Sequence, residues 1–151
     1  PALEGASVSP ESAAASADLR AALKADPVRA LEEKLFPSPI FDAARDREGV
    51  FERIEGIFRR FPQSPGRLDR APRAGAALVG RLGAVSARTL VLVGARDEPD
   101  RVLSARAVAA GIPGAELVEV PDTSRFLHIE ESRAVMRRLT DFFIPEPEIE
   151  R

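Results

Sequence analysis

Residues 90–93 form the apolar run Leu-Val-Leu-Val, which Gly94 ends. An unbroken run of this length, β-branched in part, is typical of a strand buried on both faces of a parallel sheet, because crossover helices cover both sides of such a sheet. A parallel neighbour is reached only through a crossover of roughly a dozen residues or more. The run therefore predicts an α/β fold in which a helix and a second strand follow.

The next residues have the pattern of such a crossover. Residues 102–111 carry apolar side chains at helical spacing and end at Gly111, a suitable C-terminal stop. Residues 116–120, Glu-Leu-Val-Glu-Val, combine apolar and alternating polar positions as an edge strand does. An amphipathic helix is predicted over 131–143, with Val135, Leu139 and Phe142 inward. This order of elements predicts a parallel sheet with right-handed crossovers.

The preceding part of the chain carries helical signals and no convincing strand. Ser9-Pro10 and Asp26-Pro27 each place an N-cap residue before a proline at the first helical position. The second signal leads into an apolar stripe formed by Val28, Leu31 and Leu35, which Pro37 and Pro39 end. The best-defined helix has one apolar face, formed by Val50, Ile54, Ile57, Phe58 and Phe61. A last helical segment is predicted over 72–82.

Two parallel strands are too few for a stable sheet. A sheet of that size is marginal in water, and the run at 90–93 would expose a face made to be covered. Ordering the backbone alone costs about 1–2 kcal/mol per residue, which a two-stranded core does not offset. We therefore expect further strands, from a missing N-terminal portion or from a partner chain. A start at Pro1 is compatible with a processed terminus, a trimmed product or an internal fragment.

The composition limits the function classes. The chain has 151 residues, of which 44% are hydrophobic and 30% charged, as in one soluble globular domain. The net charge of -2 and the scattered basic residues indicate no nucleic-acid or anionic-membrane surface, and no apolar run approaches the roughly 20 residues of a membrane span. There is no cysteine and only one histidine, so we expect no metal site and no cofactor. A cytoplasmic location is the expectation that fits these features.

Several stretches of the chain together resemble the α/β-hydrolase fold family. Residues 81–97 resemble the stretch that enters the family's penultimate strand, and residues 111–122 resemble the helix end and last strand. Residues 126–130 resemble the segment after the family's histidine, and residues 137–143 resemble its closing helix. The helical region matches the family's cap by location only.

The resemblance implies a division of the chain and a class of partner. It implies a helical cap (lid) region over 1–82, a C-terminal α/β core segment over 83–144 and a flexible tail over 145–151. The fold class is then the C-terminal part of an α/β-hydrolase fold preceded by its cap. The partners would be the N-terminal half, which completes the sheet, and a small-molecule substrate bound under the cap.

Asp97 is the candidate catalytic residue that the resemblance implies. In the family, the acid of the catalytic triad stands at the third residue after the glycine, and Asp97 has that place after Gly94. A carboxylate there orients the histidine tautomer and stabilises the imidazolium that forms when the nucleophile loses its proton. The alternative is that Asp97, or Asp100 beside Pro99, caps the helix that begins near residue 101.

The family's histidine position is occupied by Arg125. The family pattern is Gly-His-x-x-x-x-Glu, and the matching residues here are 124–130, Ser-Arg-Phe-Leu-His-Ile-Glu. Arginine cannot take a proton from serine, because its pKa lies above about 12. It could instead pair with Asp97 and hold the site in an inert state. His128, the only histidine, would serve as base only if it replaced a residue three positions away, and the alternative is a loop-packing role.

The serine nucleophile of the family has no counterpart in this sequence. No Gly-x-Ser-x-Gly elbow occurs, and Ser7, Ser9 and Ser124 fit caps or loops. The resemblance implies the cap and C-terminal half of a hydrolase for an ester-like or other apolar small molecule, inactive as this chain alone. A non-catalytic, degenerate hydrolase that serves as a binding or interaction module is the alternative. A truncated product without independent function is a third possibility.

Overall fold

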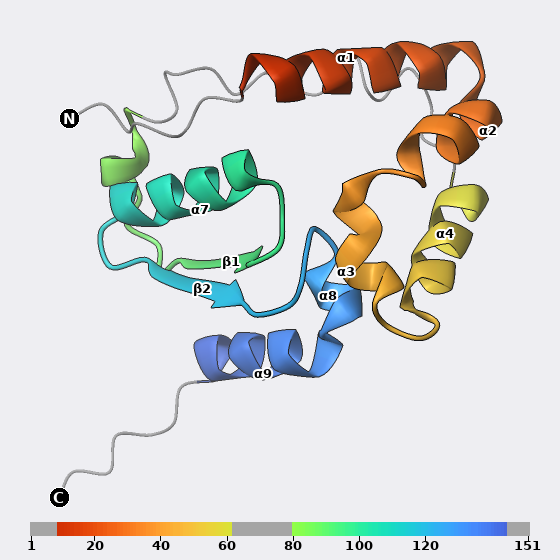
Figure 1. Cartoon of the computed structure of the whole chain (residues 1–151). Helices are drawn as coiled ribbons and strands as arrows, with labels where there is room; N and C mark the ends of the chain where they lie inside the picture. Colours follow the sequence, from red (N-terminus) through yellow and green to blue (C-terminus); the bar gives the residue numbers. More distant parts are fainter. Residues whose placement is uncertain (1–8, 62–79, 145–151) are drawn as a thin grey trace, which may run out of the picture.

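The structure, a computed structural model, describes residues 9–61 and 80–144. Most of these residues are helical, and the strands among them form one small parallel sheet (Figure 1). This confirms the predicted α/β character. The helix predicted over 72–82 lies largely outside the described residues, and the described chain resumes just before the 3-10 helix η3 (Leu82–Ala84). Ser7 and the tail at 145–151 also lie outside them.

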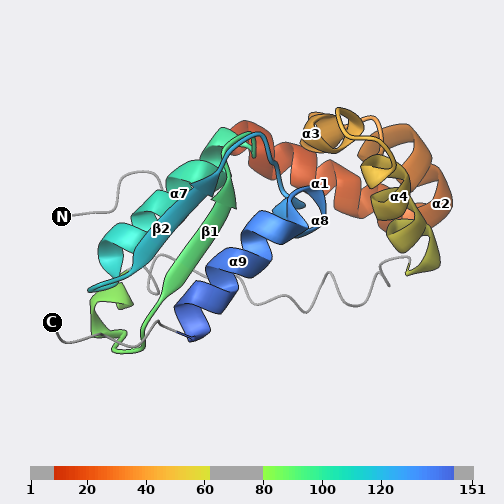
Figure 2. The same ribbon diagram turned by 90° about the horizontal axis from the view of Figure 1, so that it is seen from below.

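The sheet consists of β1 (Leu90–Gly94) and β2 (Glu116–Val120), paired in parallel from Leu90 opposite Glu116 to Gly94 opposite Val120. Helix α7 (Pro99–Gly111) is the crossover between them, and α9 (Ser132–Phe143) lies on the other side of the strands (Figures 1 and 2). The predicted order of strand, helix, strand and helix is therefore confirmed, and α7 ends at Gly111 as expected.

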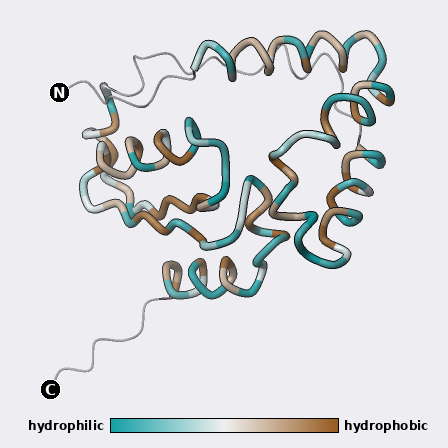
Figure 3. The backbone as a smooth tube through the Cα atoms, in the orientation of Figure 1, coloured by the Kyte–Doolittle hydropathy of each residue, from teal (hydrophilic) through white to brown (hydrophobic). Residues whose placement is uncertain are grey.

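The prediction that the run at 90–93 is buried on both faces is wrong for the described structure. Leu90, Val91 and Leu92 are half-buried, and only Val93 and Gly94 at the end of the strand are buried. The run is nevertheless hydrophobic throughout (Figure 3). The physical reason is that each strand has a neighbour on one side only among the described residues, so that both are edge strands.

The helical region begins its helices where the proline signals predict. Helix α1 spans Pro10–Ala25, and α2 spans Pro27–Ala30 with Asp26 as N-cap, its Oδ1 accepting the Arg29 N–H at 3.0 Å. The chain continues through the π-helix η1 (Leu31–Leu35), the 3-10 helix η2 (Pro39–Phe41) and α3 (Asp42–Arg45). Helix α4 (Val50–Arg60) completes the region. The η1 segment stops before Pro37, as predicted.

The core of the helical region is built around phenylalanine rings. Phe41 is fully buried and packs edge-on against Phe36, Phe51 and Phe58, with Ile54 buried beside them. Its buried residues are Leu23, Ala30, Leu31, Leu35, Phe36, Phe41, Ala44 and Ile54. The described structure therefore has its densest core here rather than in the sheet.

Two predicted apolar faces are only partly buried. Val28, in the first turn of the short helix α2, is 65% exposed, although Leu31 and Leu35 of the same stripe are buried. In α4 the buried side chain is Ile54, while Ile57 and Phe61 are 44% and 68% exposed. Ile57 lies in the last turn of α4 and Phe61 is its C-cap residue, and nothing among the described residues covers them fully.

The helical region is joined to the sheet by contacts to the segment after β2. Phe126 stacks on Phe41 with ring centroids 5.1 Å apart and an angle of 9°. Arg47 donates to the Asp122 carbonyl oxygen at 2.7 Å and to Glu131 at 3.1 Å. The short helix α8 (Leu127–Glu130), which the sequence pattern did not predict, lies beside these contacts.

Candidate functional site

The loops that follow β1 and β2 meet at the carboxyl edge of the sheet. The Ala95 N–H donates to the Val120 carbonyl oxygen at 2.9 Å, and the Arg96 N–H donates to that of Thr123 at 2.8 Å. Gly94 permits this approach, because a Cβ at this position would lie 2.3 Å from the Ser124 carbonyl oxygen. Crevices at this edge of a parallel sheet are where α/β proteins bind ligands.

The loop after β2 is held by buried polar contacts around Ser124. The Ser124 N–H donates to Glu130 Oε2 at 2.5 Å, and its hydroxyl lies 2.6 Å from Glu130 Oε1 and 2.9 Å from the Ile40 carbonyl oxygen. Ser124 and Glu130 are both buried. Ser124 is therefore a structural loop residue, and Glu130 fixes the backbone next to Arg125. The sequence indicated Glu130 only as the last position of the Gly-His-x-x-x-x-Glu pattern.

Asp97 lies in the turn that directly follows β1. Its side chain is 7% exposed, and its Oδ1 accepts the Glu98 N–H at 2.8 Å. Burial raises the pKa of Asp97, and the hydrogen bond from Glu98 and the charge of Arg125 oppose that rise. Asp97 does not occupy the N-cap position of α7, which belongs to Glu98, and Asp100 accepts the Ser9 N–H at 2.8 Å.

Arg125 reaches the same site from the loop after β2. Its Nε lies 3.9 Å from Asp97 Oδ1, while its Nη2 donates to the Glu98 carboxylate. Arg101 also donates to Glu98, from Nε at 3.3 Å. Burial lowers the pKa of Arg125, and the neighbouring charge of Arg101 lowers it further. The expected ion pair between Arg125 and Asp97 is therefore present but long, without a hydrogen bond between them. Arg125 is hydrogen-bonded to Glu98, a partner that the sequence did not predict.

His128 lies away from this cluster. It is on α8 with an exposed side chain, and within the described ranges no hydrogen bond or ion pair joins it to Asp97. The structure therefore brings Arg125, and not His128, to Asp97. No group of three or more carboxylate or histidine side chains suited to a metal ion occurs in the described part of the chain. Within the same ranges, no helix is long and apolar enough to cross a membrane.

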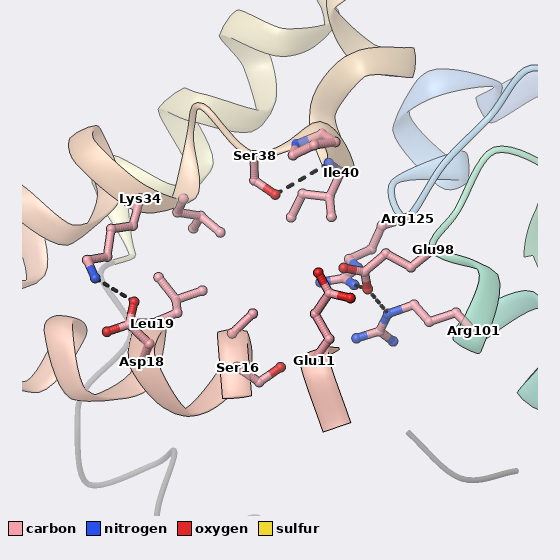
Figure 4. Close-up of a pocket in the computed structure, with 13 residues that line it drawn as sticks. Glu11, Ser16, Asp18, Leu19, Lys34, Ser38, Ile40, Glu98, Arg101 and Arg125 are labelled. Carbon is pink, nitrogen blue, oxygen red and sulfur yellow. Dashed lines mark hydrogen bonds and ion pairs between the residues drawn. The ribbon is translucent and has the colours of Figure 1, made fainter. Parts of the chain in front are cut away.

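Two cavities border the cluster, and residues 38–40 line both of them. One, of about 470 Å³, lies between α1, the segment 34–40 and the residues Glu98, Arg101 and Arg125 (Figure 4). The other, of about 390 Å³, is lined by Asp97, Arg96 and Pro99. Glu98 lines both cavities. Residues of the helical region therefore line both cavities beside the site, and the cavities have the size that small molecules occupy.

Comparison with known proteins bears on the fold. No family model and no curated protein matches this chain. Among solved structures the chain is similar to Est816, an N-acyl homoserine lactone degrading enzyme, with a TM-score of 0.55 and 22% sequence identity. The match covers 82% of this chain and 53% of Est816, so the chain spans about half the length of that protein. The likeness shows that this chain shares the fold of that part of Est816.

Proposed function

We propose that this chain is the cap and C-terminal half of an α/β-hydrolase for an ester-like or other apolar small molecule, and that it is inactive alone. The observation that carries the proposal is the meeting of Asp97 and Arg125, 3.9 Å apart at the carboxyl edge of a parallel sheet. Those two places belong to the acid and the histidine in the family that the sequence resembles. The fold shared with a lactone-degrading enzyme supports this assignment, since a lactone is a cyclic ester.

The chemistry of Arg125 explains why the chain would be inactive. A serine hydrolase needs a neutral imidazole that accepts the serine proton, whereas a guanidinium stays charged and offers only donors. Loss of the base lowers kcat by a factor on the order of 10⁶. Asp97 would orient a histidine at the position of Arg125, but the residue that faces it is an arginine hydrogen-bonded to Glu98.

The sheet supports the expectation of a second half. Leu90, Val91 and Leu92 are half-buried on an edge strand, and Met136 and Phe143 of α9 are exposed. These apolar side chains would be covered by further strands. We propose that an N-terminal portion or a partner chain supplies them, together with the serine on its Gly-x-Ser-x-Gly elbow.

The first experiment asks which polypeptide accompanies this sequence in its native source. The protein is captured through an antibody against residues 99–111, and its intact mass and peptides are measured. We expect a peptide with a serine elbow, either in the same polypeptide or in a co-purifying one. Recovery of this chain alone, folded and monomeric, would contradict the split or longer enzyme.

The second experiment tests Arg125 in that native assembly. Arg125→His should raise turnover of p-nitrophenyl butyrate at least roughly 100-fold, because general-base catalysis contributes about 10²–10⁴. Arg125→Lys is the matched control, since it keeps the positive charge and should stay inactive. The gained activity should be lost after treatment with diisopropyl fluorophosphate. Equal activity of the two variants would show that Arg125 does not stand in the place of the base.

The second candidate function is a non-catalytic binding module. The observation that favours it is the hydrogen bonding of Arg125 to Glu98, which gives the arginine a fixed place in a covered site. This function predicts that the native assembly retains a small molecule and that Arg125→His weakens that binding without creating turnover. Turnover by the histidine variant would decide for the hydrolase.

A further inference from the structure

The two strands of the sheet differ in the side chains that they carry. Among the described residues β1 and β2 each have one neighbouring strand, so each has one free edge. Strand β2 carries two glutamates, of which Glu119 pairs with Arg106 of α7 at 2.6 Å. The other, Glu116, pairs with Arg88 at 3.2 Å. The run at 90–93 of β1 has no charged side chain. Because charged side chains on an edge strand hinder the pairing of a further strand, β2 has the character of a sheet end and β1 does not.

The free edge of β1 carries backbone groups that are suited to a further strand. The carbonyl oxygen of Thr89 and the N–H of Ala95 both form hydrogen bonds of 2.9 Å with β2. The backbone groups of successive residues point alternately to the two sides of a strand, so those of Leu90 and Leu92 point away from β2. No described strand lies on that side. Leu90 and Leu92 are half-buried, and buried N–H and C=O groups need hydrogen-bond partners.

The side chains of Leu90 and Leu92 lie on the face of the sheet that α9 covers. Glu119 is paired with Arg106 of α7, so Glu119 and its register partner Val93 face α7. Side chains alternate between the two faces of a strand, which places Leu90 and Leu92 on the opposite face. Helix α9 lies on that side of the strands (Figures 1 and 2). Two strands therefore leave part of this apolar face open.

Helix α9 lies past the free edge of β1. Seen from below, β1 lies between β2 and α9 (Figure 2). Val135 is the buried side chain of α9, whereas Met136 and Phe143 are 59% and 73% exposed. Leu139, three residues after Met136 and four before Phe143, is half-buried and belongs to the same side of the helix. This apolar side is wider than the part that the described strands cover.

We propose that a strand of the missing portion pairs with the free edge of β1 and packs against α9, and that β2 is the end of the sheet. The existence of that portion is part of the proposed function, on which this inference rests. Backbone hydrogen bonds to Leu90 and Leu92 hold the added strand, as when an extended segment joins a sheet edge. Its side chains toward α9 are apolar and cover Met136 and Phe143. A chain with the fold of Est816 has room for such a strand, since this chain matches 53% of that protein.

The experiment uses single introduced thiols, because the chain has no cysteine of its own. Met136→Cys reports on α9, and Glu116→Cys is the matched reporter on β2, where the side chain is 55% exposed. The rate of modification by N-ethylmaleimide is measured by mass spectrometry, for the 151-residue chain alone and for the native assembly. We expect the assembly to slow the reaction of the Met136 variant at least roughly tenfold and that of the Glu116 variant less than about twofold, because thiol reactivity follows exposure.

A second reporter protects the test from a local defect at one position. Phe143→Cys lies on the same side of α9 and should be slowed in the assembly as Met136→Cys is. All three substituted side chains are exposed in the chain alone, so the circular dichroism spectrum of each variant should match that of the parent chain. Equal slowing on α9 and β2, or slowing on β2 alone, would overturn the inference.

Failure of this inference is distinguishable from failure of the proposed function. Slowing at Glu116→Cys with none on α9 places the second half at the other edge, which contradicts the inference and leaves the proposed function standing. The same holds if a polypeptide with a serine elbow is present and no position is slowed. No slowing in material that contains this chain alone contradicts both.

Discussion

Gly94 is the residue at which the two loops of the site come closest. A Cβ there would lie 2.3 Å from the Ser124 carbonyl oxygen and 2.5 Å from that of Thr123, and both are backbone atoms that cannot turn aside. Gly94→Ala should therefore destabilise the chain by about 1–3 kcal/mol, measured as the urea midpoint by circular dichroism. Gly56 of α4 is the control, since nothing lies within 4 Å of its Cβ position. Gly56→Ala should stabilise by about 0.5–1 kcal/mol, and equal effects of the two would contradict the close approach.

Asp97 should make stability depend on pH in a defined direction. Its pKa is raised by burial, so the folded state holds this proton more tightly than the unfolded state. The contribution of the protonated form is fully present below the unfolded value of 3.8 and is lost as pH rises through the folded value. Asp97→Asn should therefore gain stability relative to the parent chain as pH rises from about 4 to about 7, measured by urea unfolding at each pH. The same substitution at the exposed Asp141 is the control, and a gap that shrinks with pH would contradict burial as the dominant cause.

Among the elements, the junction between the helical region and the sheet depends on Arg47. Its guanidinium donates to the carbonyl oxygens of Ala43 and Asp122 and to Glu131, and its side chain is 21% exposed. Arg47→Gln should lower the free energy of unfolding by about 1–3 kcal/mol, because partly buried acceptors lose their donor. Arg29→Gln is the matched control, since Arg29 is exposed and its side chain pairs with Glu33 on the same helical surface. Its urea midpoint should not move, and a shift as large as that of the Arg47 variant would contradict a specific role for Arg47.

The elements themselves show which sequence signals are reliable. The Ser9-Pro10 and Asp26-Pro27 pairs start helices where predicted, because a cap and a fixed proline φ act within one turn of chain. The stripe that begins at Val28 is buried only at Leu31 and Leu35, while Val28 itself is 65% exposed. Local signals therefore locate the ends of elements better than they locate buried faces.

At the scale of the whole molecule, the stability of the described structure is unevenly distributed. The largest fully buried side chains are Phe41, Ile54, Thr123 and Ser124, and none of them belongs to a strand. We expect amides of β1 and β2 to exchange hydrogen faster than those around Phe41 in the chain alone, because edge strands of a two-stranded sheet open locally. Hydrogen–deuterium exchange with mass spectrometry measures both. In the native assembly with its second half, the amides of β1 and β2 should exchange more slowly than those around Phe41. If the strand amides already exchange more slowly in the chain alone, that result would contradict the need for further strands.

The sequence by itself determined the order of β1, α7, β2 and α9 and the parallel sheet, and its family resemblance implied the places of Asp97 and Arg125. Those features depend on interactions within a strand or a helical turn and on the rule that parallel strands end together. Only the tertiary structure decided that Arg125 bonds to Glu98, that Glu130 anchors Ser124 and that His128 lies away from the site. The physical reason is that a charged side chain pairs with the opposite charge that the folded chain places within hydrogen-bonding distance. Neither that placement nor the burial of the pair follows from spacing along the chain. The cavity beneath α1 has the same origin, because it exists only where α1, η1 and the loop after β1 come together.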